Sequence, residues 1–268
     1  MRAVAIIARN VFRESVRDKV LYNLVFFAIL LMAASYLIGQ LTAGQDVKII
    51  KDLGLAATSI FGLFIAVFIG IGLVSKEVEK RSIYALLAKP IHRYQVVLGK
   101  YAGLVLTLGV NLAVMATALY LVLAYMAWAA GPTAAAGWDR PALDPSLLKA
   151  FAMTFVELSV VTAIAVFFST FSTPLLSAAL TFGFFVVGRF SADLRNFNQV
   201  VESPVAAAFV RSLYWILPNL APFDVRGQVV HGQPVTSGYM AITAGYGALY
   251  AAALIVAAML IFSRRDFK

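Results

Sequence analysis

Residue patterns that could perform catalysis are sparse in this sequence of 268 residues. There is no G-x-x-x-x-G-K-[ST] motif, so we do not expect the chain to cradle nucleotide phosphates or hydrolyse ATP. The G-x-S-x-G turn that exposes a hydrolase nucleophile is also absent. Without cysteine, the sequence offers no disulfide and no thiolate metal site. We therefore predict no catalytic residue, no metal site and no cofactor bound by this chain.

One acidic residue, Glu157, interrupts the apolar run Leu147–Phe168. If this run spans a membrane, Glu157 lies near the middle of the bilayer, where an unpaired acid costs about 3 kcal/mol. Its carboxyl group must therefore face protein or water. One interpretation makes Glu157 part of a translocation path or gate, together with Asn111. The other makes it a neutral carboxyl hydrogen-bonded to a neighbouring helix, near Asn111 or Ser159, and the sequence leaves both open.

A second unusual feature is the charged stretch at residues 77–101, EVEKRSIYALLAKPIHRYQVVLGKY, which lies between two apolar runs. Ser82 can cap a short helix that continues through Leu87. Pro90 disfavours helical geometry at the preceding residue and removes a backbone donor, so the chain must bend there. A new helix is predicted to start near Arg93. The apolar face of the short helix consists of Ile83, Leu86 and Leu87.

The composition indicates the medium in which these residues must be positioned. Hydrophobic residues make up 62% of the chain and charged residues only 13%, and the mean hydropathy is +0.87, which is far from the averages of soluble domains. The apolar residues gather in six runs close to or above the roughly 20 residues that a helix needs to cross a bilayer. We predict an all-α integral membrane protein with one domain, residues 1–268. The predicted spans are residues 22–41, 54–74, 101–130, 147–168, 174–190 and 239–262.

Lysine and arginine are distributed very unevenly among the segments between these runs. With the N-terminus inside, the N-terminal segment, the loop 75–100 and the C-terminal end contain 14 cations and five acids, whereas the rest of the chain contains eight of each. The inner side thus carries the whole formal net charge of +9, as the positive-inside rule favours. We predict both termini on the cytoplasmic side of the inner membrane, in contact with membrane lipids. No soluble basic domain is present, so no nucleic-acid binding is expected.

The first 20 residues predict an interfacial helix along the cytoplasmic leaflet. At about 100° per residue, its arginines fall on one part of the circumference and its apolar side chains on another. The alternative is a plain positively charged topology signal, which needs cations but no apolar stripe. The arginines expected at the membrane interface are Arg2, Arg9, Arg13 and Arg17.

Residues 191–238 form a long outer segment between the fifth and sixth predicted spans. Within it, Val205–Leu217 is apolar but too short to cross the membrane, and Pro218 ends it. We therefore predict a re-entrant or interfacial outer helix. The alternative, a seventh span, would place hydrophilic ends on the wrong sides of the membrane and disturb the charge distribution.

The order of residues in the charged stretch is shared with a known family. It runs Glu77, Glu79, Arg81, Ser82, Ile83, two residues, Leu86, Leu87, two residues, Pro90, two residues, Arg93. With the amphipathic N-terminus, the turn FSTFSTP at 168–174 and the outer segment ending in LYWILPNLAPFD, this order resembles type-2 ATP-binding-cassette (ABC) permeases. The resemblance covers essentially the whole chain and does not identify a transported substance.

This resemblance implies a function for the loop 75–100. In that family the loop forms a coupling helix that docks in a groove of a separate ATPase subunit, so Ile83, Tyr84 and Leu87 would fill the groove. It further implies an ABC exporter in which this chain is the permease, as a homodimer with two ATPase copies. ATP and Mg would then bind to the partner ATPase.

Two alternatives to an exporter remain. A non-transporting membrane scaffold or assembly factor would need docking surfaces but no translocation path. A proton-coupled secondary transporter would depend on Glu157, although the sequence lacks the multiple intramembrane charges and broken helices usual in that class. An ATPase gene beside the gene for this chain would favour the exporter.

Overall fold

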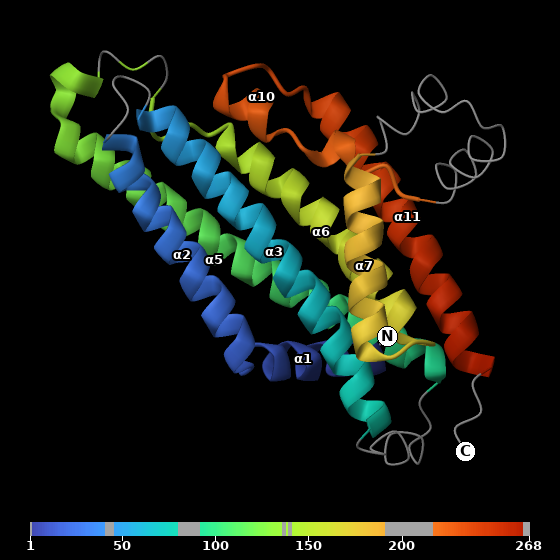
Figure 1. Ribbon diagram of the computed structural model, residues 1–268. Helices are drawn as coiled ribbons and strands as arrows, with labels where there is room; N and C mark the ends of the chain where they lie inside the picture. Colours follow the sequence, from blue (N-terminus) through green and yellow to red (C-terminus); the bar gives the residue numbers. More distant parts are fainter. Residues whose placement is uncertain are drawn as a thin grey trace, which may run out of the picture.

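The computed structural model describes residues 2–40, 46–79, 92–135, 138, 141–190 and 217–264, and all regular secondary structure within these ranges is helical (Figure 1). Five of the described helices are long and apolar enough to cross a membrane. This confirms the predicted fold class, an all-α integral membrane protein. The five helices are α2 (Lys19–Gln40), α3 (Asp46–Glu79), α5 (Arg93–Ala135), α6 (Leu147–Ser169) and α11 (Ser237–Arg264).

The remaining predicted span, 174–190, forms a shorter helix, α7 (Pro174–Arg189). Proline occupies its first position, where the missing backbone N–H leaves no hydrogen bond unmade. With 16 residues, α7 is about 24 Å long, which is less than the roughly 30 Å of hydrocarbon in a bilayer. Five full-length helices and one short apolar helix are therefore described, and helix length alone does not establish six spans.

Two helices, α3 and α6, form the centre of the bundle. In their most apolar windows 67% and 72% of residues are buried, against 22% in α2 and 28% in α11. A small residue allows the two central helices to approach closely, because a Cβ atom added at Gly70 would lie only 2.7 Å from the Cβ of Ala165. Side chains on α6 therefore face protein on most sides, and α2 and α11 form the periphery.

Both α3 and α5 extend well beyond their predicted spans of 54–74 and 101–130. Hydropathy marks only the part of a helix that lies in hydrocarbon, whereas backbone hydrogen bonding continues through the polar residues beyond it. On the side of the loop 75–100, α3 continues to Glu79, and α5 begins at Arg93, where the sequence placed the start of a helix. At the other end, α5 contains Gly131 with a φ of 72°, which breaks its helical geometry.

The N-terminal helix α1 (Arg2–Ser15) lies across one end of the bundle, the end at which α11 finishes (Figure 1). It packs on α5 at glycines, since a Cβ atom added at Gly103 would lie 2.6 Å from the carbonyl oxygen of Ala8. Val11 is buried in this contact. The predicted interfacial arginines Arg9, Arg13 and Arg17 are exposed, and the side chain of Arg2 is outside the description. The structure thus places Val11 of α1 against protein and leaves Arg9 and Arg13 exposed.

Gly103→Val should separate α1 from α5. The added side chain would overlap backbone atoms of α1, and overpacking of this kind costs about 1–3 kcal/mol. We expect a lower thermal unfolding midpoint in detergent and faster proteolysis within residues 2–15. Gly245→Val in α11 is the matched control, because nothing lies within 4 Å of a Cβ atom at Gly245. Equal effects of the two substitutions would contradict the described packing of α1.

Candidate functional site

Most of the predicted coupling loop lies outside the described residues. Glu77 and Glu79 belong to the last turns of α3, and Arg93 is the first residue of α5, but the side chains of these three residues are not described. The predicted outer helix, apart from Leu217 at its end, is likewise not described. The coupling residues that lie wholly outside the description are Arg81, Ser82, Ile83, Tyr84, Leu86, Leu87 and Pro90.

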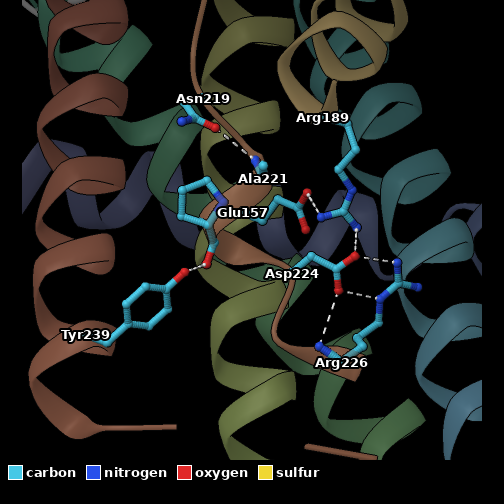
Figure 2. A network of polar contacts seen from close by, with 8 residues as sticks. Glu157, Arg189, Asn219, Ala221, Asp224, Arg226 and Tyr239 are labelled. Carbon is cyan, nitrogen blue, oxygen red and sulfur yellow. Dashed lines mark hydrogen bonds and ion pairs between the residues drawn. The ribbon is translucent and has the colours of Figure 1, made fainter. Parts of the chain in front are cut away.

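Glu157 has an arginine partner in the structure. It lies in α6 with its side chain only 2% exposed, and the Nη1 atom of Arg189 is 3.0 Å from its Oε1 atom. Arg189 is the last residue of α7, and its guanidinium also lies 5.8 Å from the centroid of the Phe185 ring. The carboxylate and guanidinium therefore form a buried ion pair between α6 and α7 (Figure 2).

The ion pair continues into residues of the predicted outer segment 191–238. Asp224 lies beside Arg189, with Oδ2 and Nη2 3.3 Å apart. Arg226, the first residue of the short helix α10 (Arg226–Val230), donates from Nε to Asp224 Oδ1 at 2.8 Å and from Nη2 to Oδ2 at 2.9 Å. Figure 2 shows the four side chains in one chain of contacts. We call Glu157, Arg189, Asp224 and Arg226 the ionic cluster.

The end of α7 holds the backbone that presents Asp224. The N–H of Leu220 donates to the carbonyl oxygen of Gly188 at 2.9 Å. Gly188 permits this approach, because a Cβ atom there would lie 2.7 Å from the carbonyl oxygen of Pro218. Leu220 is fully buried, so the chain from residue 217 packs on α7 within the bundle.

The next residues form the 3-10 helix η2 (Ala221–Phe223), which is held on two sides. Phe223 is buried, and a Cβ atom added at Gly247 of α11 would lie 2.9 Å from its ring. The hydroxyl of Tyr239 donates to the carbonyl oxygen of Pro222 at 2.7 Å (Figure 2). These contacts fix the position of the following residue, Asp224.

The members of the ionic cluster differ in exposure, and the buried end is at Glu157. The side chains are 2% exposed for Glu157, 16% for Arg189, 23% for Arg226 and 32% for Asp224. Burial by itself would raise the pKa of Asp224, but the hydrogen bond from Arg226 and the charges of Arg189 and Arg226 outweigh it and lower that pKa. Two acids and two arginines give the cluster no formal net charge. It connects the buried pair Glu157–Arg189 to the partly exposed pair Asp224–Arg226.

The partner of Glu157 differs from the one that the sequence suggested. Asn111 donates to the carbonyl oxygen of Thr107 in its own helix, and Ser159 donates to that of Phe155. Among the described residues, Glu157 therefore pairs with Arg189 in place of the expected Asn111 or Ser159. The assignment of Glu157 and Asn111 to a translocation path remains a prediction.

Sequence reasoning missed three members of the ionic cluster. Arg189 looked like an ordinary cation at the end of a span, and Asp224 and Arg226 were counted only in the balanced outer charge. Two signals were present, namely an arginine inside the predicted span 174–190 and the spacing D-x-R at 224–226. The pairing itself depends on where α7 ends and where the chain re-enters the bundle.

The ionic cluster links separate segments of the chain. Its members come from α6, α7 and the segment at 224–226, so it connects three parts of the chain that are distant in sequence. Within the described part of the chain, no group of three or more acidic or histidine side chains could hold a metal ion. The arrangement can hold these three segments together, and separation of the charges would release them.

The sequence matches a family model over nearly its whole length. The matched residues are 5–267, and the family is described as ABC-2 family transporter protein. No curated protein matches the chain. The match includes every helix that contributes to the ionic cluster and both ends of the predicted coupling loop.

Arg189→Met should be much more destabilising than Arg226→Met. Loss of Arg189 leaves the buried Glu157 without its partner, which typically costs about 3–5 kcal/mol. Loss of Arg226 leaves Asp224 with Arg189 and with access to solvent. Adding Glu157→Gln to Arg189→Met should recover part of the loss, because no buried charge then remains. The thermal unfolding midpoints of the three variants and of the unchanged protein provide the measurement, and an absence of recovery in the double variant would refute the buried ion pair.

Proposed function

Because this chain belongs to the ABC-2 transporter family, we propose that it is the permease subunit of an ATP-driven ABC exporter. Its apolar helices make it a multi-pass membrane protein, and the family implies an ABC ATPase subunit as partner. The finer assignments belong to the proposal. They are an exporter rather than an importer, the cytoplasmic (inner) membrane, a homodimer of this chain and two copies of the ATPase.

The loop 75–100 is the proposed docking element for the ATPase. Its sequence combines apolar positions at Ile83, Leu86 and Leu87 with flanking cations, a combination that fits a small groove with an acidic rim. The two longest described helices, α3 with 34 residues and α5 with 43, lead into and out of this loop. A displacement of the loop would therefore be transmitted directly to the centre of the bundle, where α3 packs on α6.

The ionic cluster is the proposed outer gate. It joins α6 and α7 to the segment at 224–226, at the end of α7 opposite Pro174. Polar contacts that are partly solvated can be exchanged for water at lower cost than fully buried ones. The Asp224 contacts would thus separate first as the outer ends of the helices move apart, and the Glu157–Arg189 pair would hold α6 and α7 together.

The proposed cycle couples these two elements. When the two ATPases close on ATP and Mg, residues 82–88 move with them as a rigid lever. The helices of the two permease copies then rearrange, and the substrate passes outward or out of the leaflet. The single observation that carries the proposal is the family match over residues 5–267, and the charged loop supplies the coupling element.

The most informative experiment is co-purification of this chain with the ATPase, followed by measurement of ATP hydrolysis with candidate substrates. An exporter should retain the ATPase and show hydrolysis that responds to one substrate. A scaffold would retain partners without any change in hydrolysis. A proton-coupled secondary transporter would move its substrate without the ATPase.

The proposed topology can be tested with reporters fused along the chain. Since every surplus cation lies in segments assigned to the inside, fusions after Lys89 and after Lys268 should both report a cytoplasmic location. A fusion at Gly137 should report an outside location. An outside signal from the C-terminal fusion would exclude the six-span arrangement.

Leu86→Asp and Leu87→Asp should each release the ATPase. Loss of one buried anchor at the centre of an interface costs on the order of 2 kcal/mol, about thirtyfold in affinity, and a charge in the groove adds a desolvation penalty. Lys80→Ala is the control at the rim and should weaken binding mildly and in a salt-dependent way. The measurement is ATPase recovery with each variant at matched expression. Full recovery with both aspartate variants would show that this loop is not the coupling element.

A further inference from the structure

A groove runs along the outside of the bundle on α5. Two adjoining hollows form it, one of about 410 Å³ beside α1 and one of about 550 Å³ that reaches α6. Leu98 and Ala102 line both hollows, so they are continuous. We call this continuous hollow the α5 groove. Its α1 end includes Ala5, Ala8 and Tyr94, and its far end includes Gly109, Ala113 and Phe155.

The far part of the α5 groove is lined almost entirely by apolar side chains. Its one hydroxyl, on Tyr101, donates to the carbonyl oxygen of Ser159 at 3.3 Å and is therefore already used. From Leu98 to Ala113 the helix rises about 22 Å, which is more than one leaflet of a hydrocarbon core about 30 Å thick. A ligand that fills this part must be long, apolar and able to lie parallel to α5.

The end beside α1 has a different chemistry. Arg9 follows Ala8 directly and lies one helical turn after Ala5, and both alanines line the groove. Arg9 and, one helical turn further on, Arg13 are both exposed. The rings of Tyr94 and His92 stack at the same end, 5.6 Å apart, as aromatic residues do at a membrane interface. Cations at one end and an apolar path from it suit an amphiphile with an anionic head.

We propose that the α5 groove binds an acyl chain of an anionic phospholipid whose phosphate lies beside Arg9 and Arg13. An acyl chain gains little free energy when it moves from bulk lipid into an apolar groove. The contacts of the headgroup must therefore supply much of the preference of the lipid for this site. A transmembrane helix of a second copy is a poorer fit. Such a helix is rigid and about 10 Å wide, and it would meet α1 where α1 crosses α5 at Gly99 and Gly103, whereas an acyl chain can bend.

The first test uses the full chain in nanodiscs that contain phosphatidylglycerol with a photoreactive acyl chain. Cross-links should concentrate in the peptides that carry residues 98–113 and Phe155. Ala113→Phe, which fills the groove, should reduce these cross-links to background. Ala129→Phe is the matched control at an exposed position of the same helix outside the groove, and it should leave them unchanged.

The second test addresses the headgroup and needs no change within the groove. The same photoreactive chain is placed on phosphatidylglycerol and on phosphatidylcholine, and the ratio of groove cross-links is compared. Arg9→Gln should lower this ratio about fivefold, which is the contribution of one cation beside an anionic surface. Arg17→Gln, an exposed cation beyond the end of α1, should change it less.

Two results would overturn the proposal. One is a uniform distribution of cross-links over the exposed faces of α2, α5 and α11, which would mean ordinary contact with bulk lipid. The other is a disulfide-linked dimer of the Ala113→Cys variant, which would show that a second copy covers the groove. The chain has no other cysteine, so such a disulfide must join residue 113 of one copy to residue 113 of the other.

Discussion

The cost of burying a carboxylate within a bundle of apolar helices determines much of this structure. The side chain of Glu157 in α6 is almost completely buried, and the charge of Arg189, 3.0 Å away, offsets the cost of that burial. The partner is the last residue of α7, so α7 must end at the depth of Glu157. Arg189 then needs a second acid, which the chain supplies by returning into the bundle at 217–226. One buried charge therefore fixes the end of a helix and the entry of a loop.

Close approach of helices is the complementary constraint. In lipid, the hydrophobic effect does not drive helices together. Helix packing there depends on small residues, which allow the backbones of two helices to approach closely. Gly70 serves this purpose between α3 and α6, and Gly103 between α5 and α1. The same two helices, α3 and α5, lead to the charged loop, so the segments best placed to transmit a movement are also among the most closely packed.

The sequence predicts the parts of the fold that depend on local pattern. Hydropathy locates α6 almost to the residue, and the paired arginine and apolar faces identify α1. Hydropathy underestimates the lengths of α3 and α5, because the polar residues at their ends remain helical beyond the apolar runs. It also indicates that Glu157 needs a polar environment, but it does not identify Arg189. That pairing depends on tertiary packing of segments 32 residues apart, and no local pattern records where Leu220 meets Gly188.

The short length of α7 has a consequence for the surrounding bilayer. A helix of about 24 Å leaves a hydrophobic mismatch of several ångströms against a hydrocarbon core of about 30 Å. On this side of the bundle the missing length is filled by residues 217–226, which are protein with a partly hydrated ionic end, and not by lipid. The apolar stretch that α7 provides is therefore shorter than those of α2 and α11, and it ends in the charged contacts of Arg189.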